Sequence, residues 1–152
     1  RVERFGGHGW VDPEFPNQFF ADDGEFIING KRILVLGGAY SVDKFYRLMN
    51  GWEWFPDEQM PFETQERLLK ECEGQHYDFV FSHTCPLEFQ PFDKMIPGLD
   101  QNTVDKTMER FLSMIEKVIT YGEWHCGHWH INRQLFDNFF FQYNIYDERS
   151  II

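Results

Sequence analysis

The alternation of apolar and polar positions predicts a β-hairpin, two helix–strand units and a last strand. Two short apolar runs flank Asn29-Gly30, a dipeptide that favours a tight hairpin turn. Apolar residues three and four positions apart predict helices, whereas unbroken apolar runs predict buried strands. The expected elements are strands at 25–28, 31–36, 77–81 and 139–146, an extended segment at 124–130, and helices at 62–73 and 102–119, the second with Asn102 as its N-cap.

Three stretches show neither the helical nor the strand pattern of apolar residues and are interpreted as loops. Residues 1–23 are rich in Gly, Pro, Asn and Asp and are interpreted as an irregular leading segment. Residues 44–60 are interpreted as a long aromatic loop, and residues 84–100 contain three prolines. A structureless connection as long as 84–100 is uncommon in a compact domain, which indicates a functional rim or lid.

The order of these elements predicts an α/β fold in which mixed β-sheet layers are flanked by helices. When strands alternate with helices, the loops at the carboxyl ends of the strands gather along one rim, where ligands of α/β proteins bind. A chain of 152 residues is long enough to bury a core without disulfides. It therefore suits a single domain, 1–152.

The net charge and the cysteines limit the classes of binding partner and the cellular compartment that are expected. The formal net charge of −11 disfavours a broad nucleic-acid-binding surface or an anionic membrane. Cys72, Cys85 and Cys126 show no disulfide spacing and suit a reducing compartment. No apolar run approaches the roughly 20 residues of a spanning helix, so a cytoplasmic protein without a membrane partner is expected. The sequence does not indicate an oligomeric state.

The run Gly127-His128-Trp129-His130 is the main candidate for chemistry. Residues two apart leave the same face of an extended segment, so His128 and His130 are predicted to reach one metal ion or two adjacent ions. His83 follows the apolar run 77–81, at the carboxyl end of a predicted buried strand. Because the strand ends share one rim, the three histidines are expected to meet there.

Three sequence strings carry a family resemblance. Ser82-His83-Thr84-Cys85-Pro86, followed by Gly127-His128-Trp129-His130, resembles the last two metal-binding motifs of the calcineurin-like metallophosphoesterases. Leu36-Gly37-Gly38-Ala39-Tyr40-Ser41 also resembles a strand and turn of bacterial and phage members, and the match covers roughly residues 24–146.

The resemblance implies a hydrolase, a phosphatase or phosphodiesterase, folded as a four-layer α/β/β/α sandwich. It implies two divalent metal ions, Mn, Fe, Zn or Mg, of which His83 and His128 would ligate one and His130 the other. Asn132 and Arg133, directly after the histidines, are candidates for contact with the phosphate-ester substrate. A salt bridge or a solvated position is the alternative for Arg133.

The chain departs from the family pattern in its first three motifs. An Asp-x-His, a Gly-Asp with a following Asp, and a Gly-Asn-His do not occur in residues 1–152. The bridging carboxylate and the proposed catalytic histidine are therefore missing, and the catalytic residues stay unknown. We expect a C-terminal portion of a longer phosphoesterase domain, inactive alone, with a degenerate homologue as the alternative. The carboxylates considered as substitutes are Asp12, Asp22, Asp23 and Asp43.

Two other functions stay open from the residues alone. One is a structural zinc site in a non-catalytic binding module, since zinc favours tetrahedral sets of Cys and His. The other is an α/β module without a metal, in which the histidines are coincidental. The zinc ligands would be drawn from His83, Cys85, His125, Cys126, His128 and His130.

Overall fold

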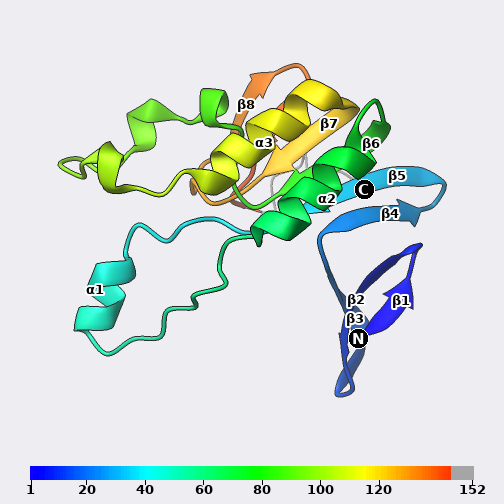
Figure 1. Ribbon diagram of the computed structural model, residues 1–152, viewed down its shortest axis with the longest axis horizontal. Helices are drawn as coiled ribbons and strands as arrows, with labels where there is room; N and C mark the ends of the chain where they lie inside the picture. The colour runs from blue at the N-terminus through cyan, green and yellow to red at the C-terminus, as the bar shows by residue number, and fades with distance from the viewer. Residues whose placement is uncertain (145–152) are drawn as a thin grey trace.

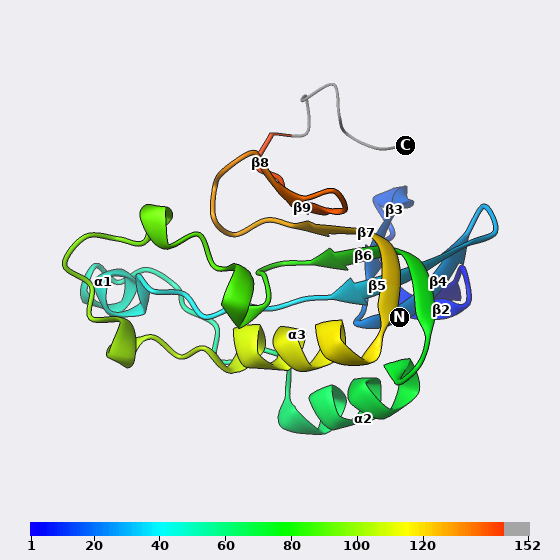
Figure 2. The same ribbon diagram turned by 90° about the horizontal axis from the view of Figure 1, so that it is seen from above.

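The computed structural model describes residues 1–144, which form two β-sheets and three α-helices (Figures 1 and 2). The smaller sheet contains β1 (Val2–Arg4), β2 (Gly7–Asp12) and β3 (Phe15–Ala21). The larger sheet contains β4 (Gly24–Ile28), β5 (Lys31–Leu36), β6 (His76–Ser82), β7 (Thr120–Cys126), β8 (Arg133–Phe136) and β9 (Phe139–Phe141). The helices are α1 (Lys44–Met49), α2 (Phe62–Cys72) and α3 (Thr107–Val118).

The larger sheet has the strand order β4-β5-β6-β7-β9-β8. Strands β5, β6, β7 and β9 run parallel, and β4 and β8 pair antiparallel at the two edges. Because parallel strands end at the same edge, the loops after β5, β6 and β7 lie along one rim of the sheet. The predicted mixed α/β class is confirmed, whereas the four-layer sandwich stays a prediction.

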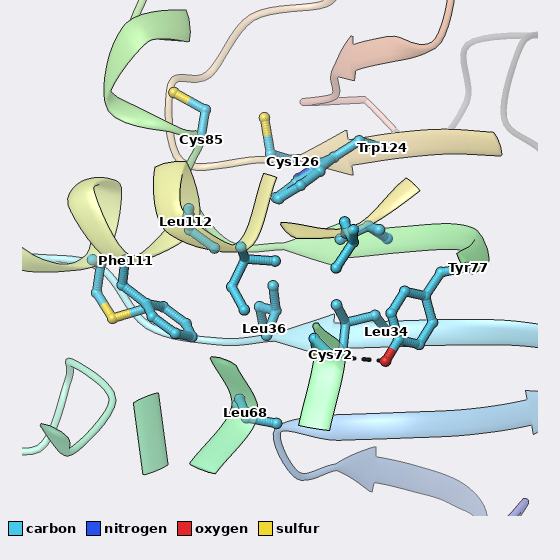
Figure 3. Close-up of a cluster of buried hydrophobic side chains, with 14 of the residues drawn as sticks. Leu34, Leu36, Leu68, Cys72, Tyr77, Cys85, Phe111, Leu112, Trp124 and Cys126 are labelled. Atoms are coloured by element: carbon cyan, nitrogen blue, oxygen red, sulfur yellow. Dashed lines mark hydrogen bonds between the residues drawn. The ribbon is translucent and has the colours of Figure 1, made fainter. Parts of the chain in front are cut away.

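The core lies between the larger sheet and the pair α2 and α3, which lie side by side on one of its faces (Figures 1 and 2). Leu34, Val80, Trp124 and Phe139 are paired across four neighbouring strands and are all fully buried. The apolar stripe of α3 packs onto this row, as the helical spacing predicted. Figure 3 shows part of this cluster, including Phe111, Leu112 and Leu68 from the helices. Within residues 1–144, none of the helices has both the length and the apolar character needed to cross a bilayer.

The predicted hairpin and the helix at 62–73 are confirmed. Asn29 and Gly30 have φ values of 52° and 76°, the left-handed conformation that the two-residue turn between β4 and β5 requires. Helix α2 covers 62–72, and Pro61 lies just before it.

The prediction of an irregular leading segment at 1–23 is wrong, because residues 2–21 form the antiparallel sheet β1–β2–β3. Gly7 and Gly9 break the alternation that would have revealed β2. Both are needed there for close packing, since a Cβ at Gly7 would overlap the Phe26 ring and one at Gly9 would overlap the backbone of Phe20. The glycines that allow β2 to pack closely therefore also remove the apolar–polar alternation from which a strand is predicted.

Other predicted boundaries also shift. Residues 44–49 form α1 inside the stretch interpreted as a loop. The helix predicted from 102 begins at Thr107, because Asp100 caps a separate 3₁₀ turn, Gln101–Thr103, by accepting a hydrogen bond from the Asn102 amide. The segment predicted as extended over 124–130 leaves the sheet after Cys126. Of the strand predicted at 139–146, residues 139–141 form β9, while 145 and 146 lie outside the described residues.

Candidate functional site

His83 and His128 meet at the rim of the larger sheet. His83 follows the end of β6, and its amide donates to the Leu36 carbonyl at the end of β5 at 3.1 Å. The Gly127 amide donates to the His83 carbonyl at 3.0 Å, which joins the loops after β6 and β7. This backbone bracing brings His128 Nδ1 within 3.2 Å of His83 Nε2. The two ring nitrogens therefore point at one small volume.

His130 lies beside this pair, but the predicted backbone is wrong. His128 and His130 have φ values of 63° and 52°, so both adopt the left-handed conformation instead of an extended one. The chain turns sharply after β7, where the Trp129 amide donates to the Gly127 carbonyl at 2.7 Å. This turn, not strand geometry, brings both imidazoles to the same cavity. Left-handed non-glycine residues are strained, and such strain is concentrated at functional sites.

The surroundings of His83 and His128 favour the neutral forms of both imidazoles. Burial, with His83 and His130 nearby, lowers the pKa of His128 to about 4, and Glu58 opposes that shift. Burial, with His130 as a smaller cause, also lowers the pKa of His83. Near pH 7 both rings therefore carry a lone pair that can bind a metal ion.

A cavity of about 440 Å³ is lined by His128 and His130, whereas His83 is not among its lining residues. The loop after β5 and helix α1 supply Tyr40, Asp43 and Arg47 on one side. The long connection at 84–100 supplies Met95 and Ile96 on another, so the stretch that the sequence indicated as a rim does line a cavity. Its other lining residues are Ser41, Val42, Gln90, Lys94, Leu99, Gln101, Val104, Glu109, His128, Trp129 and His130.

Of the four carboxylates considered from the sequence, Asp43 alone is among the residues that line this cavity. Its Oδ2 accepts a hydrogen bond from Arg47 Nε at 2.8 Å. Asp12 lies on β2, Asp22 pairs with Arg1, and Asp23 accepts from the Gly37 amide. Within residues 1–144, no three side chains of His, Cys, Asp or Glu converge in a geometry that could hold a metal ion.

The sequence missed two acidic residues that the fold brings to the site. Glu58 lies close enough to His128 to influence its pKa, and its Oε1 accepts from the Ser41 amide at 2.9 Å. Glu109, on α3, also lines the cavity. Glu58 comes from the stretch interpreted as a loop, where no periodicity marked it. The proximity of Glu58 to His128 arises only from the tertiary fold.

The cysteines and His125 lie away from the paired histidines. Cys85 and Cys126 are buried in the core, where burial raises the pKa of both thiols, that of Cys85 to about 12. Figure 3 shows the two side chains within the apolar cluster. His125 points to the opposite face of the sheet from Cys126, and its Nε2 contacts Glu123 Oε2 at 3.0 Å.

Asn132 and Arg133 have partners elsewhere. Arg133 forms a two-pronged ion pair with Asp93, with contacts of 2.9 and 2.7 Å, in a different pocket from the one that His128 and His130 line. The Asn132 side-chain oxygen accepts from the amides of Tyr143 and Asn144. Both side chains brace the segment around β8 and β9, which agrees with the salt-bridge alternative for Arg133.

Comparison with known proteins adds no family assignment. No family model, no curated protein and no solved structure matches the chain. The resemblance to metallophosphoesterases therefore rests on the sequence strings, and the function must be argued from the histidines and the cavity.

Proposed function

We propose that the chain carries metal ligands of a phosphoesterase that hydrolyses a phosphomonoester or phosphodiester with two divalent metal ions. The observation that supports this most directly is the 3.2 Å approach of His83 Nε2 and His128 Nδ1. His83 and His128 would hold one ion and His130 the other, with Mn, Fe, Zn or Mg as candidate metals. Such ions neutralise the phosphate charge and activate a water for attack.

The donors and their spacing fit a shared ion. Metal–nitrogen bonds run about 2.0–2.1 Å, so two nitrogens in one tetrahedral shell lie about 3.3 Å apart. The observed separation of 3.2 Å is close to that value. The lowered pKa values of both rings favour the neutral form that a metal requires.

The anionic part of the site is incomplete within residues 1–144. Three neutral imidazoles leave the charge of two divalent ions uncompensated, so a bridging carboxylate is required. Asp43 and Glu58 lie nearby, but Arg47 and the Ser41 amide already engage them. Glu109 also lines the cavity, but its carboxyl group is buried and accepts a hydrogen bond from Thr84 Oγ1. We therefore propose, as the resemblance implies, that the bridging carboxylate comes from outside the described residues and that the chain alone is inactive.

The contacts within the described residues do not favour a structural zinc site on the cysteines. Cys85 and Cys126 are both buried within the apolar cluster, and neither takes part in the contact between His83 and His128. His125 cannot join Cys126 in one ligand set, because the two side chains leave opposite faces of β7.

Paramagnetic broadening by Mn²⁺ in amide NMR spectra tests the ligand assignment, because it detects even weak binding. We expect broadening centred on His83, His128 and His130, and its loss in His128→Ala. His76→Ala is the matched control, since His76 starts β6 at the far end of the strand and contacts Thr120. A variant with both Cys85 and Cys126 changed to Ala should keep the broadening. Loss of binding in that variant would support the zinc site instead.

Hydrolysis of an aryl phosphodiester with added Mn²⁺ tests the catalytic part. We expect residues 1–152 alone to show no turnover above background, because within residues 1–144 no set of ligands with a bridging carboxylate is assembled. The same residues joined to the natural upstream segment should turn over, and His128→Ala in that longer chain should lower the rate at least about 100-fold. Equal activity of the two chains would show that residues 1–152 hold a complete site.

A further inference from the structure

Helix α1 presents an apolar face to solvent. Its side chains Phe45, Tyr46, Leu48 and Met49 lie within about half of the helix circumference, because successive residues are about 100° apart. The ring of Trp52, just after the helix, extends this face by packing edge-to-face on Tyr46 at 5.6 Å. All five residues are between 51% and 85% exposed. We call these five residues the α1 face.

The charged residues of α1 lie on its other side and contact neighbouring parts of the chain. Arg47 Nε donates to Asp43 Oδ2 at 2.8 Å, and both residues line the cavity. Lys44 Nζ lies 3.7 Å from the centroid of the Trp54 ring. An ordinary surface helix has the reverse arrangement, with its apolar side chains toward the core. The α1 face therefore has the character of an interface with another molecule.

We propose that the α1 face binds the α1 face of a second copy of this chain and forms a two-fold symmetric dimer. With the symmetry axis perpendicular to α1, the two helices run antiparallel, so Phe45 would lie against Met49 of the partner subunit. Contacts between methionine and aromatic rings are favourable, and the flexible methionine adapts to the fit. Figures 1 and 2 show α1 beyond the end of the larger sheet, away from α2 and α3, where a second copy can approach it.

The size and charge of the α1 face suit a second copy. A fully exposed large apolar residue presents about 200 Å², so the five residues together expose about 600 Å² of accessible surface. A stable interface takes about 800 Å² from each partner, and a polar rim supplies the remainder. The net charge of −11 makes copies of the chain repel one another, whereas residues 43–53 contain two acidic and two basic residues. Two copies therefore meet at α1 without a local excess of like charge.

A lipid surface suits the α1 face less well. Helices that lie in a membrane interface carry basic residues that attract anionic headgroups. The two basic residues of α1, Lys44 and Arg47, are instead engaged by Trp54 and Asp43. The net charge of −11 also repels an anionic membrane. The observations therefore favour a second copy of the chain.

Sedimentation equilibrium of residues 1–152 tests the dimer. We expect a monomer–dimer equilibrium with a Kd in the micromolar range, as a small interface gives. Phe45→Ser combined with Met49→Ser should weaken dimerisation at least about tenfold, because two central apolar side chains are lost. Both positions are exposed, so the fold should be retained, which circular dichroism checks. Phe92→Ser is the matched control, since Phe92 is as exposed as Phe45 but lies outside the α1 face, and it should leave the dimer intact.

The outcomes decide what covers the α1 face. A chain that stays monomeric at about 100 μM, or a dimer that the double variant does not weaken, would overturn the proposal. Binding of a monomeric chain to phosphatidylcholine vesicles, lost in the double variant, would identify a lipid surface as the occupant instead. The chain joined to its natural upstream segment should dimerise as well. If that longer chain is monomeric, the upstream segment covers the α1 face and a second copy does not.

Discussion

Glu109 is a single residue whose buried carboxyl group lowers the stability of the fold. Its Oε1 is paired with Thr84, whereas its Oε2 is buried without a partner among residues 1–144. Burial raises the pKa of this carboxyl, which means that ionisation is less favourable in the folded protein than in the unfolded chain.

The pH dependence of stability tests this cost. A carboxyl with a raised folded pKa binds its proton more tightly in the folded state, so its contribution to stability falls as the pH rises above the unfolded value of about 4.3. Glu109→Gln should therefore raise the melting temperature by about 2–4 °C at pH 8. The gain at pH 4 should be smaller. The measurement is thermal unfolding by circular dichroism at both values. Glu116→Gln serves as the control, and an equal gain from it would show that net charge alone is responsible.

At the scale of elements, the loop after β5 is held in place by close contact with the segment before α2. The Ala39 amide donates to the Glu58 carbonyl at 3.2 Å, and the Ser41 amide donates to the Glu58 carboxylate at 2.9 Å. Gly38 lies at φ 92°, and a Cβ on it would come within 2.9 Å of the Glu58 carbonyl oxygen. Gly38 thus permits the contact that brings Glu58 to the histidines.

Gly38→Ala should destabilise the protein more than the same change at Gly30. Both glycines have positive φ, which costs an alanine about 1–2 kcal/mol. A Cβ at Gly30 meets no atom within 4 Å, whereas one at Gly38 also collides with backbone, adding about 1–3 kcal/mol. Urea unfolding should therefore give a loss of about 1–2 kcal/mol for Gly30→Ala and about 2–5 kcal/mol for Gly38→Ala. Similar losses would show that the loop after β5 moves away easily.

The elements that the sequence predicted are those whose signal is local. The Asn29-Gly30 hairpin and the helix beginning near Phe62 follow from turn chemistry and apolar spacing, and both are present. The strand β2 was not predicted, because glycines stand where the alternating pattern of a strand would have apolar residues. The meeting of His83 and His128 was expected from strand ends, but the left-handed turn at His128 was not. The nearness of Glu58 to His128 and of Glu109 to the cavity depends on contacts between distant segments, which no sequence spacing encodes.

Across the molecule, the two faces of the larger sheet differ in how far other elements bury them. The row Leu34, Val80, Trp124 and Phe139 faces α2 and α3 and is fully buried. The adjacent row on the other face contains Val35, Phe81, His125 and Phe140, with the rings of His125 and Phe140 stacked at 5.0 Å. Phe81 in this row is 39% exposed. The second face is thus apolar but only half buried, and it is where the predicted second sheet of a sandwich would pack.

Substitutions on the two faces should therefore have unequal effects. Phe111→Ala, on the helix face, should cost about 3–5 kcal/mol because it opens a cavity in a fully buried cluster. Phe81→Thr retains a strand-forming residue and loses only partly buried contacts with Phe79 and His125, so we expect about 1 kcal/mol or less. The same change should reduce the binding of the hydrophobic dye ANS and concentration-dependent association, because it removes exposed apolar surface. Urea unfolding and light scattering measure the two effects. If Phe81→Thr destabilises the protein as much as Phe111→Ala does, the second face is already part of a complete core, and the case for a further layer over it is lost.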